Sequence, residues 1–123
     1  MLFRSRCQSP ILAFMTPVSG WAFPVYISNH THSVAEVALT VTDGDTNEVV
    51  LQETYTLSPD ETRQVASVRG FVSDKRLFVL RYTVNGTAHA NHFLTGMPPY
   101  APQDMLRWLD VIRQLPEPFD FTP

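Results

Sequence analysis

LFVLRYTVNGTAHANHFL (residues 77–94) decides the fold of this chain. Apolar and polar residues alternate on both sides of Asn85-Gly86, and a period of two residues is typical of β-strands. Asn-Gly favours a two-residue type I′ turn, because both central positions of that turn need a positive φ angle. The stretch therefore predicts an antiparallel hairpin of residues 77–84 and 87–94.

The first strand of this hairpin is apolar on both faces. One face carries Phe78, Leu80, Tyr82 and Val84, and the other carries Leu77 and Val79. A strand that is buried on two sides belongs in the middle of a sheet or beneath a helix.

The same alternation extends upstream to residue 11. It predicts five further strands, at residues 11–15, 23–28, 36–42, 49–57 and 62–68, which are separated by turns rich in Asp, Asn, Gly and Pro. Seven short strands with regular turn signals indicate an all-β fold. We expect an immunoglobulin-like β-sandwich of about seven antiparallel strands, followed by one C-terminal amphipathic helix.

Residues 101–116 predict that helix. Pro102 suits the first helical turn, Asp104 places a negative charge where the helix dipole favours it, and Pro116 ends the pattern. One apolar stripe is formed by Met105, Trp108, Leu109, Ile112 and Leu115. The stripe can pack on the sandwich itself or on another domain or subunit. The expected organisation is an N-terminal segment with a first strand (1–20), the sandwich (21–100), the helix (101–116) and a tail (117–123).

Composition excludes several classes of protein. The chain has 123 residues, of which 44% are hydrophobic and 17% charged, so it can bury the core of one globular domain. A net charge of −3 with scattered basic residues argues against a nucleic-acid partner. Cys7 is the single cysteine, which excludes an internal disulfide. Neither a signal peptide nor an apolar run long enough to span a membrane is visible, and bacterial cytoplasm and envelope both stay open as locations.

Two pairs of histidines have spacings to consider for metal binding. His30 and His32 would share one face of a strand, but they lie in a polar stretch that reads as a loop. His89 and His92 are three residues apart, which places them on opposite faces of an extended strand. We therefore expect no metal site and no cofactor. A small enzyme that uses the region of His30 and His32 is the weakest of three functional hypotheses, and metal analysis tests it.

Acidic residues concentrate in turns, at Asp43, Asp45, Glu48, Asp60, Glu61 and Asp74. They read as solvated loop charges and not as a converging catalytic pair. A nucleophile elbow and a phosphate-binding loop are also absent from the sequence. The sequence therefore predicts no catalytic residues, and the chain alone is not expected to be an enzyme.

Aromatic side chains offer a binding function. Trp21, Tyr26 and Tyr100 could present flat faces that stack on sugar rings, which would make the chain a carbohydrate-binding module. In a small sandwich, aromatic residues also serve as core or interface residues. Both interpretations stay open at this point.

The order of elements resembles the C-terminal β-sandwich domain of family-2 glycoside hydrolases, in particular β-mannosidase-like members. VYISNHT (residues 25–31) is similar to the opening strand of such domains, and the strand, Asp-Gly turn and strand of residues 37–52 are similar to the hairpin that follows. The most specific match is ANHFLTGMPPY (residues 90–100) followed by Arg107-Trp108-Leu109. The resemblance covers about residues 22–115.

This resemblance implies a non-catalytic accessory domain whose partners are the other domains of a parent glycosidase. In that family the catalytic glutamates lie in a (β/α)₈ barrel of roughly 250 residues, so none is expected here. Asn91 and His92 would anchor the crossover at Pro98 and Pro99 by hydrogen bonds. The packing residues would be Phe78, Leu80, Trp108, Leu109 and Ile112.

Overall fold

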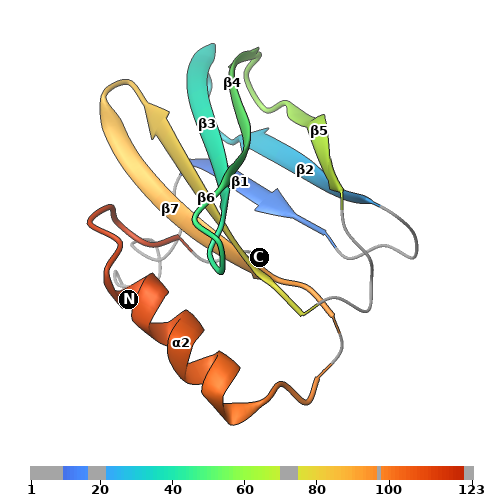
Figure 1. Ribbon diagram of the computed structural model, residues 1–123. Helices are drawn as coiled ribbons and strands as arrows, with labels where there is room; N and C mark the ends of the chain where they lie inside the picture. Colours follow the sequence, from blue (N-terminus) through green and yellow to red (C-terminus); the bar gives the residue numbers. More distant parts are fainter. Residues whose placement is uncertain (1–9, 17–21, 70–74, 97, 121–123) are drawn as a thin grey trace.

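A computed structural model describes residues 10–16, 22–69, 75–96 and 98–120. These residues form seven strands and one helix, which are β1 (Ile11–Met15), β2 (Ala22–Asn29), β3 (Ala35–Asp43), β4 (Val49–Leu57), β5 (Thr62–Arg69), β6 (Leu77–Val84), β7 (Thr87–Leu94) and α2 (Pro102–Arg113). The strands make two layers, with α2 lying across the outer side of one of them (Figure 1). The prediction of an all-β sandwich with one short C-terminal helix is confirmed.

The two sheets are antiparallel throughout. One has the order β1-β2-β5 and the other the order β4-β3-β6-β7. The β6–β7 hairpin turns at Asn85 and Gly86, whose φ angles are 51° and 84°. Both angles are positive, as the Asn-Gly pair predicts.

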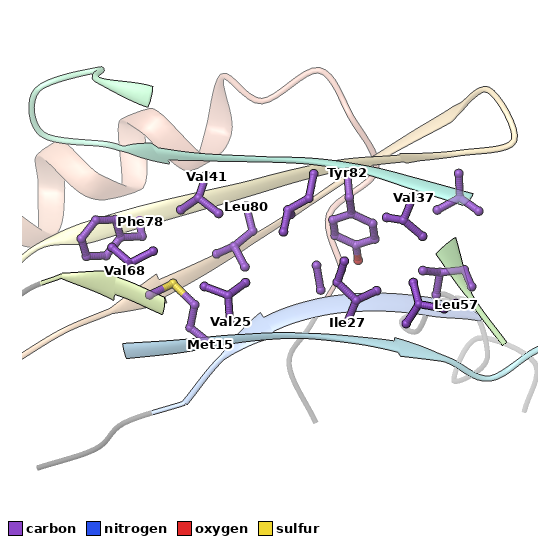
Figure 2. Close-up of a cluster of buried hydrophobic side chains, with 14 of the residues drawn as sticks. Met15, Val25, Ile27, Val37, Val41, Leu57, Val68, Phe78, Leu80 and Tyr82 are labelled. Atoms are coloured by element: carbon purple, nitrogen blue, oxygen red, sulfur yellow. The ribbon is translucent and has the colours of Figure 1, made fainter. Parts of the chain in front are cut away.

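The core lies between the sheets and follows the period-two pattern. Val37, Leu39 and Val41 of β3 point inward and are at most 1% exposed, whereas their neighbours Glu36 and Ala38 are exposed. Figure 2 shows Val37 and Val41 on the opposite layer from Val25 and Ile27 of β2, and Leu39 belongs to the same core cluster. Alternation therefore sorts the residues of β2 and β3 into a buried and an outer face.

Strand β6 is buried on both sides. The sequence predicted a place in the middle of a sheet or beneath the helix, and the structure shows both. The strand lies between β3 and β7, and it also runs beneath α2. Phe78, Leu80, Tyr82 and Val84 join the core between the sheets, whereas Leu77 and Val79 pack against Trp108 of the helix.

The buried face of α2 differs from the predicted stripe at one position. Trp108 is 1% exposed and lies at the centre of a cluster that includes Met105, Val111, Ile112 and Leu115. Leu109 was expected in this cluster but is 38% exposed. Successive helical residues are about 100° apart around the axis, so Leu109 lies at the margin of a face centred on Trp108. Val111, about 60° away on the other side, takes its place.

Helix α2 is shorter than the expected span of 101–116. It begins at Pro102 and ends at Arg113, where the N–H of Gln114 bonds to the carbonyl groups of Asp110 and Val111. Asp104 lies in its first turn and Arg113 in its last, so both charges complement the helix dipole.

Candidate functional site

The turn between β3 and β4 holds the helix onto the sheet through Asp45. Trp108 Nε1 donates a hydrogen bond of 2.7 Å to Asp45 Oδ1, and Arg107 contacts the same oxygen at 2.5 Å. The backbone N–H of Leu77 donates to Asp45 Oδ2 at 3.3 Å. One carboxylate thus joins the turn, the helix and the first residue of β6, and we call this group the Asp45 clamp (Asp45, Leu77, Arg107, Trp108).

Asp43 supports the clamp from inside the turn. Its Oδ1 accepts the backbone N–H of Asp45 at 2.8 Å, and its Oδ2 pairs with Arg76 at 3.0 Å. Gly44 N donates to Leu77 O at 2.7 Å. A Cβ atom on Gly44 would lie 2.8 Å from Leu77 Cδ2, so the close approach of the turn to β6 requires a glycine here.

The expectation that Asp43 and Asp45 are solvated is wrong. The side chain of Asp43 is 2% exposed and that of Asp45 is 18% exposed. The prediction identified the turn but not its neighbours, because Arg107 and Trp108 of the helix lie 62 and 63 residues after Asp45 in the chain.

Asn29 fixes the loop that follows β2. Its side chain is completely buried and bonds to backbone groups of three segments and to one hydroxyl group. Its Oδ1 accepts the N–H and the O–H of Thr31, at 3.0 and 2.6 Å, and its Nδ2 donates to the carbonyl groups of Ser33, Leu57 and Ser58. The Asn-His-Thr motif of the family resemblance is therefore a loop anchor in this structure.

A second polar group joins β6 and β7 to the residues that follow α2. Tyr82 O–H donates a hydrogen bond of 2.6 Å to Asp120 Oδ2. The ring of His89 stacks on Tyr82, and its Nδ1 lies 3.2 Å from the same oxygen. Burial, together with the adjacent Asp120 carboxylate, raises the pKa of the Tyr82 hydroxyl, so this group stays a hydrogen-bond donor.

The two predicted anchor residues, Asn91 and His92, contact different parts of the fold. Asn91 Nδ2 donates to Ala13 O of β1 at 3.2 Å, so this bond joins the two sheets. His92 stacks on Phe119, with ring centroids 5.1 Å apart, and burial lowers the pKa of His92. The crossover, where the Pro98–Pro99 peptide bond is cis, receives a hydrogen bond from Lys75 Nζ to Pro99 O.

The aromatic candidates for sugar contact do not form one platform. Tyr26 lies on the outer face of the three-stranded sheet, between buried Val25 and Ile27, and stacks on Phe14 at 5.5 Å. Tyr100 packs edge-on against Trp108 at 5.4 Å, on the outer side of the other sheet. Trp21 lies outside the described residues.

The histidine loop carries no metal-binding cluster, and a pocket lies beside it. His30 and His32 are both exposed, and among the described residues no group of three or more His, Cys, Asp or Glu side chains could hold a metal ion. A pocket of about 250 Å³ opens beside this loop and is lined by aliphatic and hydroxyl side chains together with His89. Neither Tyr26 nor Tyr100 lines it. Within the part of the chain that the structure covers, no helix has the length and apolar character needed to cross a membrane.

Comparisons with known proteins give a distant structural likeness. No protein-family model and no curated protein matches the chain. It is similar to a crystal structure of Bacteroides uniformis β-glucuronidase, with 14% identity and a TM-score of 0.41. It is also similar to B. uniformis β-glucuronidase 2 covalently bound to cyclophellitol-6-carboxylate aziridine, with 15% identity and a TM-score of 0.42. Each match covers 76% of this chain and 16% of the other, so the likeness concerns a small part of those enzymes.

Proposed function

We propose that this chain is a non-catalytic, immunoglobulin-like accessory domain of a β-mannosidase-like family-2 glycoside hydrolase. Its role would be to pack against the other domains of that enzyme. The sequence motif of residues 90–109 supports this proposal, because it spans β7, the crossover and the part of α2 that carries Trp108. Leu94, Tyr100 and Trp108 of this motif lie in the cluster between helix and sandwich, to which β6 contributes Leu77 and Val79.

The strand order supports the immunoglobulin-like part of the proposal. If the seven strands are lettered A, B, C, C′, E, F and G in chain order, A, B and E share one sheet, and C′, C, F and G share the other. Immunoglobulin-like domains pair B with E and C with F in the same way.

The observation that carries the packing role is the outer face of α2. Leu106, which is 65% exposed, lies on the side that faces away from the sandwich, and Leu109, which is 38% exposed, lies three residues on at the margin of that side. A surface helix normally carries polar residues on its outer side, whereas a helix with apolar residues on both sides is typical of one that lies between two layers. We infer that the second layer is another domain of the same enzyme.

The first test is the DNA sequence upstream of the codon for Met1. The proposal expects a coding region for a barrel of roughly 250 residues in the same frame or operon.

The second test measures binding between this chain and that barrel by calorimetry. Leu106→Glu combined with Leu109→Glu should weaken binding at least tenfold, because two charges would enter an apolar contact. Gln52→Glu combined with Thr54→Glu on exposed β4 is the matched control. Equal affinity of both double variants would contradict the proposal.

A carbohydrate-binding module is the alternative, and the stacked pair of Tyr26 and Phe14 favours it. Both rings are half-buried on the outer face of the three-stranded sheet, where a sugar ring could lie against them. Titration with mannan and chitosan oligosaccharides separates the two functions. Saturable binding that Tyr26→Ala abolishes and Tyr100→Ala leaves intact would support this alternative.

A further inference from the structure

The tip of the β6–β7 hairpin carries an asparagine that is followed by a glycine. Asn85 and Gly86 are both exposed, and a Cβ atom on Gly86 would meet nothing within 4 Å. The backbone nitrogen of the residue after an asparagine can attack the side-chain amide of that asparagine. A glycine leaves this nitrogen least shielded, because it has no side chain. The hairpin tip therefore presents a nucleophile and an electrophile side by side in solvent.

The other three asparagines of the chain differ from Asn85 in one feature each. Asn29 and Asn91 are at most 1% exposed, and their amide groups donate hydrogen bonds to other parts of the fold. Asn47 is exposed and has a φ angle of 66°, which is close to the 51° of Asn85. However, Asn47 is followed by Glu48, whose side chain shields the backbone nitrogen. Asn47 is therefore a control within the same molecule for the effect of Gly86.

We propose that Asn85 is a site of spontaneous deamidation, at which the backbone nitrogen of Gly86 displaces ammonia from the side chain. A bond forms between Gly86 N and Asn85 Cγ, and the bond from Cγ to Nδ2 breaks. The proton of the Gly86 N–H leaves with the ammonia, and a five-membered succinimide ring remains. Water then opens the ring at one of its two carbonyl groups. The net reaction consumes one water, releases one ammonia and replaces an amide with a carboxyl group.

The reaction requires local opening of the turn. In the closed turn Asn85 and Gly86 keep positive φ angles, and the peptide bond between them is held in one orientation. The attack needs this peptide to rotate until Gly86 N faces Asn85 Cγ. The tip opens at low cost, because residues 85–87 are all exposed and bury no apolar side chain. The rate of deamidation in the folded chain therefore reports how often the hairpin tip opens.

The two products have different effects on the hairpin. Ring opening at Cγ gives an aspartate, and Asp-Gly is also a favoured pair in a type I′ turn. Ring opening at the main-chain carbonyl gives an isoaspartate, whose backbone runs through Cβ and Cγ and is longer by one CH₂ group. This longer turn no longer fits the register in which Val84 pairs with Thr87. Both products also add a negative charge beside the pocket that Asn85 lines.

The test is incubation of the full chain at mildly alkaline pH, followed by peptide mapping with mass spectrometry. Conversion should be at least about tenfold faster at Asn85 than at Asn47, because Gly86 leaves its nitrogen open. The rate should increase with pH, because the attacking nitrogen must lose its proton. An incubation in urea shows the rate in the unfolded chain. Conversion of Asn85 only in urea, or equal rates at Asn85 and Asn47 in the folded chain, would overturn the proposal.

Two variants separate the chemistry from its effect on the hairpin. Asn85→Gly keeps a pair that suits the turn and should remove the modification without lowering the melting temperature. Asn85→Asp carries the new charge on a normal backbone. The isoaspartate form, isolated by chromatography, should melt at a lower temperature than Asn85→Asp. Equal melting temperatures of these two forms would contradict the effect that we infer for the longer turn.

Discussion

Replacing Asp45 with alanine should destabilise the protein by about 2–5 kcal/mol, because the Asp45 clamp satisfies buried donors of two different elements. Without the carboxylate, the indole N–H of Trp108 loses its acceptor in a residue that is 1% exposed. A buried donor without a partner costs about 1–3 kcal/mol. The longer bond from Leu77 N adds an amount near the lower end of that range. Arg107 is half exposed and regains water, so the loss of its pairing adds about 0–1 kcal/mol.

The free energy of unfolding is measured by urea titration, with circular dichroism as the readout. Asp110→Ala is the control on the same helix, because Asp110 is 69% exposed and lies 3.8 Å from Arg113. This control should change stability by less than about 0.5 kcal/mol.

A double-mutant cycle identifies the bond that is responsible. Trp108→Phe removes the indole donor, so Asp45→Ala should cost at least about 1 kcal/mol less in that background than in the wild type. An Asp45→Ala protein as stable as the wild type, or an equal cost in both backgrounds, would refute the reasoning.

Three further changes test other parts of the fold. Gly44→Ala should cost about 1–3 kcal/mol in urea titration, because its Cβ would press on Leu77. Asn29→Ala should lower the melting temperature measured by calorimetry, with a loss of about 2–4 kcal/mol, because Thr31 and three carbonyl groups lose their partner. Burial lowers the pKa of His92 below its ordinary value of about 6.5, so the folded state binds fewer protons than the unfolded state, and stability should fall as the pH drops from 7.5 to 5.5. His92→Gln should flatten the part of this pH dependence of the melting temperature that His92 causes.

The strands and the helix could be predicted because their signals are local. Alternation of Val37, Leu39 and Val41 fixes which face of β3 is buried, and Asn85-Gly86 fixes the turn of the β6–β7 hairpin. Both features depend on residues that are neighbours in sequence. The burial of β6 on both faces could also be predicted from the sequence, because a strand of this kind has an apolar run without alternation.

The polar contacts could not be predicted, because their partners are distant in sequence. Asp45 and Trp108 are 63 residues apart, and Tyr82 and Asp120 are 38 residues apart. Each aspartate looks like an ordinary loop or tail charge when only its neighbours are considered. One signal was available for the first pair, since the indole N–H of a buried tryptophan usually finds an acceptor. Trp108 on the buried face of α2 thus implied an acceptor, although not which one.

The Asp45 clamp also links the fold to the proposed function. Apolar packing of Trp108 and Ile112 holds α2 on the sheet, but contacts of this kind are non-directional and tolerate rotation of the helix. The hydrogen bond from Trp108 to Asp45 has a defined direction and therefore fixes the rotation of α2 about its axis. That rotation places Leu106 on the side away from the sandwich and Leu109 at its margin, the surface that the proposed neighbouring domain would cover. A largely covered carboxylate in a turn of the sheet would in this way position the proposed docking surface on the far side of the helix.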